Sequence, residues 1–300
     1  MTNVIFSFDT EDYVNPHAAD GIINSARILR EAGIKGCYNV VGMMAEALEQ
    51  WGRRDIIEEL SRYHEISTHS NRHSMHPTIN EYTDIEDFQE AVERVVREEG
   101  LAVEMIKKAT GVDRIYAAVP PGNQKSYAAM YGYHKMGVPI YADTFCDTVD
   151  GEGSYYCNIY HVAYYEAMEC FFNGDENDVK ALLEKVAKRK RAVIYTHPNS
   201  AASIGCWDIL NYDKENLVEF GKFLQCPPQP REATERFYNN IRTMLRLVKA
   251  DPRFRITTYE ELTSELSREA ERIVTIKDIP EIAKKLNESF ENIRTPVSLS

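Results

Sequence analysis

The chain has 300 residues, 43% of them hydrophobic, so it is long and apolar enough to bury one large core or two modest ones. Its 35 basic and 47 acidic residues give a formal net charge of -12. This balance argues against nucleic acid or an anionic membrane as a partner, because both are themselves negatively charged.

The cysteines and the first residues indicate a cellular location. None of the cysteines belongs to a CxxC pair, and their spacing is typical of buried thiols in a reducing cytoplasm. They are Cys37, Cys146, Cys157, Cys170, Cys206 and Cys226. The first residues, MTNVIFSFDTEDY, include acidic side chains where a signal peptide has a cationic segment followed by an apolar one. No stretch of the sequence approaches the roughly 18 apolar residues of a membrane span. We therefore expect a cytoplasmic protein; the sequence neither predicts nor excludes a homo-oligomer.

Short runs rich in β-branched and aromatic residues predict strands along the whole chain. In chain order they are Val4–Asp9, Lys35–Gly42, Glu65–His69, Arg114–Pro120, Pro139–Asp143, Asn158–Glu166, Ala192–His197 and Phe254–Thr258. Longer stretches with apolar residues at helical spacing separate these strands, and they predict helices over 18–33, 43–63, 84–111, 178–191 and 233–252. Alternation of strands and helices predicts a parallel sheet or an α/β barrel.

Two segments depart from this alternation. Residues 199–230 are irregular and hold three prolines near their end, so we expect a long loop region over one face of the sheet. After Thr258 the chain becomes charged and helical in pattern. We therefore divide the chain into a barrel over 1–262 and a C-terminal helical extension over 263–300.

Half of the eight histidines lie in one stretch, HEISTHSNRHSMH, at residues 64–76. His69 ends a predicted strand and His73 follows four residues later, a spacing that puts both rings on one side of a helical turn. Two imidazoles can bind zinc, nickel, cobalt or iron once a third ligand is supplied. Taken alone, such a pair is more often part of a polar loop.

Carboxylates at the end of the first strand supply that third ligand. Asp9, Glu11 and Asp12 lie within four residues in FSFDTED, which is costly unless positive charge is near. A divalent ion, most simply zinc, held by Asp12, His69 and His73 explains both clusters and leaves positions open for water. Glu11 is the alternative carboxylate.

Other polar or turn-forming residues also fall at strand ends. His197 ends a strand in AVIYTHP, Asp143 ends PIYAD, and Pro120 and Pro121 follow YAAV. In parallel barrels the carboxyl ends of the strands carry the catalytic groups. We therefore place Pro120, Pro121, Asn123 and Asp143 at a substrate site, with Trp207 and Asp208 reaching it from the long loop.

The order of these motifs resembles the polysaccharide deacetylase family, the NodB-homology or carbohydrate esterase family 4 group, over roughly residues 1–262. The resemblance rests on FSFDTED, HEISTHSNRHS, AAVPPGN and IYTHP. It implies a distorted (β/α)7-type barrel that uses a divalent metal ion to hydrolyse N-acetyl groups on sugars or other non-peptide amides. It further implies that Asp9 is the catalytic base, that His69 and His73 are metal ligands, and that His197 is the general acid.

Two positions depart from the family pattern. Thr10 stands where the family has a metal-binding Asp, so the resemblance leaves the ligand to Asp12 or Glu11. Val119 stands where an arginine commonly steadies the base, so Asp9 needs another donor, for which Asn123, Lys125 or a backbone amide are the candidates.

Three other functions fit parts of the pattern. A hydrolase of a small amide or ureide would use the same residues, with the 199–230 region closing over an enclosed pocket. A catalytically silent carbohydrate-binding barrel is suggested by Val119 and by the tyrosine-rich YYCNIYHVAYYEAM, whose rings could stack on sugars. An iron oxygenase uses the same ligand set, but the long amphipathic helices do not suit its double-stranded β-helix.

Overall fold

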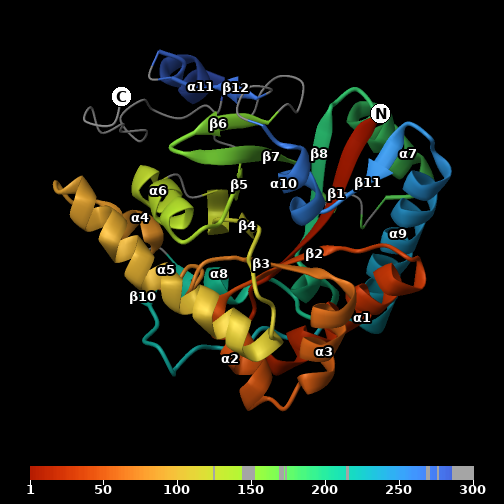
Figure 1. The fold of residues 1–300 in the computed structure, drawn as a ribbon. Coiled ribbons are helices and arrows are strands. Elements are labelled where there is room, and N and C mark those ends of the chain that lie inside the picture. Colours follow the sequence, from red (N-terminus) through yellow and green to blue (C-terminus); the bar gives the residue numbers. More distant parts are fainter. Residues whose placement is uncertain are drawn as a thin grey trace.

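The computed structural model describes residues 1–123, 126–143, 153–168, 172, 174–213, 216–267, 271–275 and 277–285. Within these residues, seven parallel strands close into a barrel (Figure 1). In pairing order they are β1 (Thr2–Thr10), β2 (Cys37–Val40), β3 (Glu65–Thr68), β4 (Ala117–Ala118), β5 (Ile140–Asp143), β7 (Ile159–Ala167) and β8 (Arg191–Thr196). β8 pairs in parallel with both β7 and β1, which closes the ring. The expected (β/α)7 barrel is confirmed.

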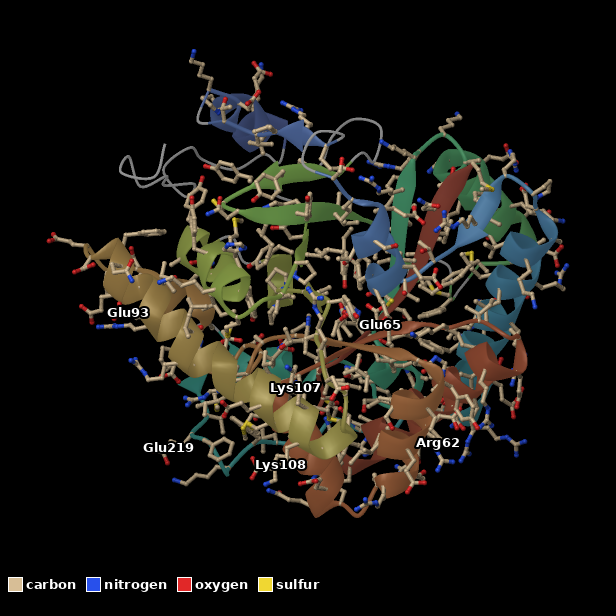
Figure 2. All side chains as sticks on the ribbon, viewed as in Figure 1. Arg62, Glu65, Glu93, Lys107, Lys108 and Glu219 are labelled. Atoms are coloured by element: carbon tan, nitrogen blue, oxygen red, sulfur yellow. The ribbon has the colours of Figure 1, made fainter. Side chains whose placement is uncertain are left out.

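Amphipathic helices surround the barrel. They are α1 (Ala19–Glu31), α2 (Gly42–Gln50), α3 (Arg54–Tyr63), α4 (Ile79–Thr83), α5 (Phe88–Thr110), α6 (Tyr127–Lys135), α7 (Glu176–Val186) and α9 (Arg231–Ala250). Where we expected one helix over 43–63, Gly52, with a φ of +68°, breaks it into α2 and α3. Figure 2 shows charged side chains such as Glu93 and Lys108 on the outward side of α5, where both are exposed.

The period-two alternation of each strand divides the core in two. A large cluster lies between the barrel and its helices. A smaller one fills the barrel and contains Ile5, Cys37, Ala117, Val119, Ile140, Ala142, Val162, Tyr164, Val193, Tyr259 and Leu262. Six of the seven barrel strands contribute to this inner cluster, whereas β3 contributes polar residues such as Glu65 and Ser67 at the same register.

Helix α10 (Tyr259–Glu265) closes the barrel at the amino ends of its strands. Tyr259 and Leu262 are fully buried in the inner cluster. The backbone amide of Glu260 donates to the carboxylate of Glu65, the first residue of β3, at 2.8 Å. The helix begins at Thr258, whose hydroxyl accepts from the amide of Glu261. The opposite end, where the strands finish, is therefore the end available for a site.

Among the described residues, three further strands belong to the same sheet but lie outside the closed ring. β11 (Phe254–Ile256), which we expected as an eighth strand, pairs with the first residues of β1. β6 (Ser154–Tyr156) runs antiparallel to β7, and β12 (Arg272–Ile273) pairs with β6. Because β12 precedes α11 (Ile279–Lys285), the described part of the C-terminal extension is not purely helical. A buried ion pair of 2.7 Å between Arg191 and Glu271 attaches this extension to the barrel.

The region 199–230 is more regular than we expected. It contains the end of a short helix η4 (Pro198–Ala201), helix α8 (Trp207–Asn211) and the strand pair β9 (Tyr212–Asp213) and β10 (Asn216–Leu217). Two further single-turn helices, η1 (Pro16–Ala18) and η2 (Pro121–Asn123), follow β1 and β4. Trp207 at the start of α8 is fully buried, so this region packs onto the barrel.

The described residues bear on the expectations about membrane spans and about the cysteines. No helix among them is both long and apolar enough to cross a membrane. Of the six cysteines, the four that the structure describes, Cys37, Cys157, Cys206 and Cys226, carry free thiols.

The buried His64 makes the fold sensitive to acid. Its Nδ1 accepts from the Gly36 amide at 3.2 Å and its Nε2 lies 3.1 Å from the Ala26 carbonyl, so the ring fits this place only when neutral. Burial lowers the pKa of His64 to about 4, against about 6.5 in an unfolded chain. The unfolded state therefore binds more protons between these values, and stability falls as pH decreases from about 6.5 to about 4.

We expect His64 to contribute roughly 3 kcal/mol to this loss. Urea unfolding of the wild type and of His64→Gln at pH 7.5 and pH 4.5 measures it, because glutamine does not titrate. The variant should show a shallower decline with acid. Parallel declines in the two proteins would contradict this assignment.

Candidate metal and catalytic site

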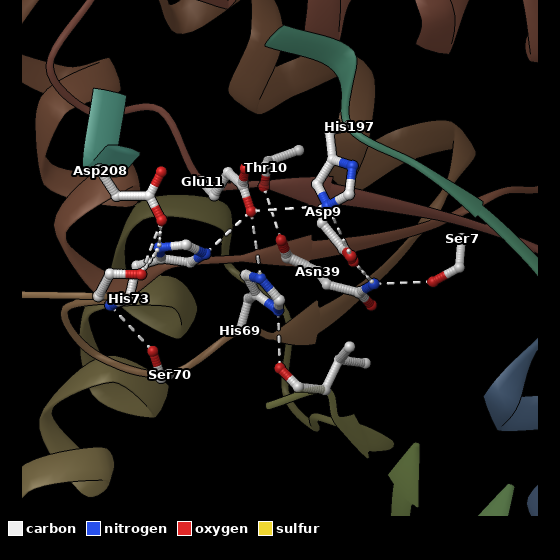
Figure 3. Close-up of polar contacts among 12 residues, drawn as sticks. Ser7, Asp9, Thr10, Glu11, Asn39, His69, Ser70, His73, His197 and Asp208 are labelled. Atoms are coloured by element: carbon white, nitrogen blue, oxygen red, sulfur yellow. Dashed lines mark hydrogen bonds and ion pairs between the residues drawn. The ribbon is translucent and has the colours of Figure 1, made fainter. Parts of the chain in front are cut away.

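Side chains from three separate segments meet at the carboxyl end of the barrel. Asp9 and Glu11 come from the end of β1, His69 and His73 from the segment after β3, and His197 from the end of β8 (Figure 3). Glu11, His69 and His73 each offer one potential ligand atom, these three atoms lie within 4.8 Å of one another, and all three residues are buried. The structure therefore brings together five of the residues that the sequence singled out, namely Asp9, Glu11, His69, His73 and His197.

Glu11 rather than Asp12 faces the two imidazoles. Glu11 Oε2 lies 2.9 Å from His73 Nε2 and 3.5 Å from His69 Nε2. Burial by itself would raise the pKa of Glu11, but His197, His73 and His69 together lower it well below its usual value. Glu11 is thus a carboxylate, the form that a metal ion requires.

The expectation that Asp12 belongs to this set is not met. Its Oδ1 accepts from the backbone amides of Val14 and Asn15 at 3.2 and 2.9 Å, and the Asn15 side-chain amide contacts both of its oxygens. Burial raises the pKa of Asp12 to about 6. The physical reason is the strand period of two, which puts Asp9 and Glu11 on one face and directs Asp12 away from it. Asp12 instead shapes the turn that leads into η1.

The two histidines approach each other through a loop and not through a helical turn. Ser70 and His73 have positive φ values of 67° and 55°, so the chain reverses sharply between them. The Ser70 hydroxyl accepts from the His73 amide at 3.0 Å and holds this reversal. The resulting distance between the two ring centroids is 5.2 Å.

The outer nitrogen of each imidazole is occupied. His69 Nδ1 lies 2.7 Å from the Val119 carbonyl, to which it can only donate. His73 Nδ1 lies 2.9 Å from the Ser74 hydroxyl, which itself donates to Asp208 on α8 at 2.8 Å. Both rings therefore carry a proton on Nδ1 and turn Nε2 toward Glu11, so that Nε2 is the nitrogen that a neutral ring would offer to a metal ion.

This arrangement fits a divalent cation. Two imidazole lone pairs and a carboxylate oxygen that face each other repel unless a proton or a cation lies among them. Glu11, His69 and His73 are the residues that would hold it, and two nitrogens with one oxygen are a donor set that suits zinc and other first-row metals. With three ligands from the protein, such an ion would keep coordination positions for water or substrate.

His197 is the most accessible member of the group. Its side chain is 30% exposed, compared with 7% or less for those of Asp9, Glu11, His69 and His73. Its Nε2 lies 3.7 Å from Asp9 Oδ2 and 3.9 Å from Glu11 Oε2. His197 is followed by η4, against which α1 packs at Gly21, where a Cβ would lie 2.0 Å from the Pro198 carbonyl oxygen. Because the His197 side chain is partly exposed, solvent reaches the site beside it.

Trp207 supports the ligand-bearing segment from the other side. Its indole Nε1 donates to the Glu11 carbonyl at 3.1 Å, and its ring lies 4.7 Å from Tyr13 and 6.1 Å from His73 between centroids. Because Trp207 is completely buried, its visible role is to fix Glu11 and His73. Asp208 acts on the same histidine through Ser74, which couples the 199–230 region to the site.

The remaining expected substrate residues lie in different places. Pro120 and Pro121 are buried and follow Val119, the residue that contacts His69, so they border the site. The side chain of Asn123 and all of Lys125 lie outside the described residues. Asp143, which we expected at the substrate site, does not lie there. It faces away from the barrel interior, opposite to Ala142, and its carboxylate lies 3.5 Å from His161 Nδ1. The end of its strand was predicted, but not the face on which the carboxylate lies.

A separate cavity of about 410 Å³ lies between the 70–79 loop and α5. Ser70 and His73 contribute to its lining, but Asp9 and His197 do not. The charged groups around it include arginines that are paired with glutamates, such as Arg94 with Glu90. This cavity is thus beside the site and not at its centre.

The comparisons with known proteins show the fold. No protein-family model matches the chain, and no curated protein matches it in sequence. Among solved structures, a candidate polysaccharide deacetylase from Mycobacterium smegmatis has a TM-score of 0.61 at 12% identity, over 92% of this chain and 93% of the other. A 4-α-glucanotransferase from Thermococcus litoralis has a TM-score of 0.59 at 12% identity, over 92% of this chain and 42% of the other.

A third structure is a CE4 family pseudoenzyme from Bacillus anthracis, with a TM-score of 0.52 at 10% identity over 90% of this chain and 66% of the other. At this identity the likeness concerns the fold alone. The chain shares the barrel of polysaccharide deacetylases and CE4 proteins, and because that barrel also carries a glucanotransferase and a pseudoenzyme, the reaction has to be argued from the site residues.

Proposed function

We propose that the protein is a metal-dependent hydrolase of non-peptide carbon–nitrogen bonds that removes N-acetyl groups from a carbohydrate. The observation that carries this proposal is the buried Glu11, His69 and His73 set with Asp9 and His197 directly beside it. Its support from outside the site is the fold that the chain shares with a candidate polysaccharide deacetylase.

A divalent ion on Glu11, His69 and His73, which we propose to be zinc, would polarise the acyl oxygen and make a water more acidic. In this proposal Asp9 accepts the proton of the attacking water, and the position of its Oδ2 near His197, on the accessible side, supports this role. As the water oxygen bonds to the acyl carbon and the carbon–nitrogen bond breaks, protonated His197 donates from Nε2 to the departing nitrogen. The products are acetate and a free amine.

The position of the two proton-transfer groups limits how the substrate binds. Asp9 and His197 come from strands that pair directly, with Phe8 opposite Thr196, so they lie side by side. The carbon–nitrogen bond to be cleaved therefore has to lie within reach of both the Asp9 carboxylate and the His197 imidazole. The departing nitrogen can leave as a neutral amine only after it has gained a proton, and we assign the supply of that proton to His197.

A second candidate is the hydrolysis of a small amide or ureide. It is favoured by the depth of the site, in which only the His197 side chain is more than 7% exposed among the five residues. A silent carbohydrate-binding barrel has one observation in its favour, the fold shared with a pseudoenzyme. The intact set of three ligands together with Asp9 and His197 argues against it.

Metal analysis combined with a substrate panel tests the proposal. We expect about one divalent ion per chain in the purified protein and acetate release from N-acetylated sugars that stops after chelation and returns when the metal is added back. Ammonia or amine release from small amides alone would favour the second candidate. A protein that binds a metal but hydrolyses no member of the panel would count for the silent barrel.

A further inference from the structure

The carboxylate of Asp9 receives two hydrogen bonds from inside the barrel, both on the same oxygen. The side-chain amide of Asn39 on β2 donates to Asp9 Oδ1 at 2.5 Å, and the hydroxyl of Tyr164 on β7 donates to it at 3.2 Å. Asp9 Oδ2 instead faces His197. Figure 3 shows Asn39 between Asp9 and Ser7. One oxygen is thus held, and the other is presented to the accessible side.

The two donors are themselves held in place. Asn39 Nδ2 lies 2.7 Å from the Ser7 hydroxyl and 2.9 Å from the Tyr164 hydroxyl, and Ser7 contacts Tyr164 at 3.0 Å. The Tyr164 ring stacks on Tyr195 with 4.6 Å between centroids. All of these side chains point into the barrel by the alternation of their strands. Asp9 is therefore hydrogen-bonded to a layer of polar side chains that also bond to one another.

Asn39 is hard to explain by stability alone. It is completely buried, and its Oδ1 has no hydrogen-bond partner among the described residues. A buried carbonyl without a partner costs free energy that an apolar residue of the same size would avoid. What the amide supplies is an N–H group directed at Asp9.

Val119 cannot provide such a donor. It is an apolar side chain of the inner cluster, at the position where the resemblance leads one to expect an arginine. Because Asn39 and Tyr164 reach Asp9 from β2 and β7, the orienting groups come from different strands than the one that bears Val119.

We propose that Asn39 and Tyr164 are positioning residues that hold Asp9 Oδ1 and direct Oδ2 toward the water that attacks the substrate. This inference rests on the proposed function, in which Asp9 is the base. It assigns to a neutral amide and a phenol the orientation that a guanidinium would otherwise supply. A base that is turned away from its water loses rate while substrate still binds.

Kinetics of Asn39→Leu and Tyr164→Phe test the inference, since both substitutions nearly preserve shape. We expect Asn39→Leu to lower kcat on the order of 100-fold with KM within about threefold. Tyr164→Phe, which removes the longer bond, should lower kcat less. Metal content should stay at the wild-type value in both. A kcat for Asn39→Leu within about threefold of the wild type would overturn the inference.

Tyr38→Phe is the matched control. Tyr38 precedes Asn39 on β2 but faces the outer core, where its hydroxyl contacts Ser25 at 3.3 Å. The variant removes a buried hydrogen bond from the same strand without touching Asp9. Its kcat should remain near the wild-type value. An equal loss of kcat in Tyr38→Phe and Asn39→Leu would show that damage to the strand, and not orientation of Asp9, is responsible.

Crystal structures of the wild type and of Asn39→Leu keep this inference separate from the proposed function. We expect one orientation of the Asp9 carboxylate in the wild type and a rotated or divided one in the variant. An unchanged Asp9 in the variant would overturn the positioning role even if the enzyme were active. A wild type that hydrolyses no amide would overturn the proposed function, while the two structures would still decide whether Asn39 and Tyr164 orient Asp9.

Discussion

Glu11→Gln should abolish stoichiometric metal binding, whereas Asp12→Asn should leave it intact. Glu11 is the carboxylate that faces His69 and His73, while Asp12 is occupied by Asn15. Loss of groups that only support a metal ligand costs about 10- to 100-fold in affinity, so loss of a ligand should exceed that range. Calorimetric titration of the metal-free proteins with zinc, together with metal analysis, measures the effect.

The same experiment can fail in a clear way. If Asp12→Asn lost the metal and Glu11→Gln retained it, the assignment of the carboxylate ligand would be wrong. A His69→Ala, His73→Ala double variant that still held one tightly bound divalent ion would refute the site as a whole. Circular dichroism spectra that match the wild type are needed in each case, because these residues are buried and a misfolded protein would also lose the metal.

Asp9→Asn should lower kcat by about 10²- to 10⁴-fold, the range for removal of a general base, while metal binding remains. Asparagine keeps the shape of the side chain but cannot accept the proton of the attacking water. His197→Gln should have a loss in the same range for substrates with a poor leaving group. An acetyl ester of a phenol should be less affected by His197→Gln, because a phenolate needs no proton to depart.

Asp143→Asn is the control for Asp9→Asn. Asp143 is also a buried carboxylate in a barrel strand, but it contacts His161 on the outward face. Its replacement should leave kcat near the wild-type value. If Asp143→Asn and Asp9→Asn lost activity equally, the distinction between inward and outward carboxylates would not hold. An Asp9→Asn protein with more than a tenth of wild-type activity would exclude Asp9 as the sole base.

The barrel could be predicted from the sequence because its signals are local. Runs such as Val4–Asp9 and Ala192–His197 are long, apolar and β-branched, and helical patterns separate the strands. The strands β6 and β12 could not be predicted in the same way, because three and two residues are too few to show a period. Phe254–Ile256 forms a strand outside the ring because it pairs with the first residues of β1. The sequence of this segment does not indicate with which strand it pairs.

The site was predictable in part for the same reason. Strand-end residues such as His69 and His197 are local features, and the barrel brings them together. The choice between Glu11 and Asp12 was also present in the sequence, since residues two apart in an extended chain share a face and Asp9 is two residues from Glu11. The expectation that Asp12 is the ligand conflicts with this period.

Asn39 and Tyr164 are different, because nothing near them in the sequence points to Asp9. Asn39 is a single polar residue in an apolar strand, and Tyr164 is one of many tyrosines in its segment. Their importance follows only from contacts between residues 30 to 155 positions apart. Such contacts become visible when the closed barrel sets the neighbours of each strand.

Helix α10 closes the amino end of the barrel, and this limits how small molecules can reach and leave Asp9 and His197. Because Tyr259 and Leu262 fill the amino end of the barrel, the accessible side of the site in the described part of the chain is the one beside His197. In the proposed reaction, acetate and the deacylated amine would have to depart by the route along which the substrate arrived. A bulky amine that lingers in that passage would trap acetate behind it, so turnover would be governed by the order in which the two products escape.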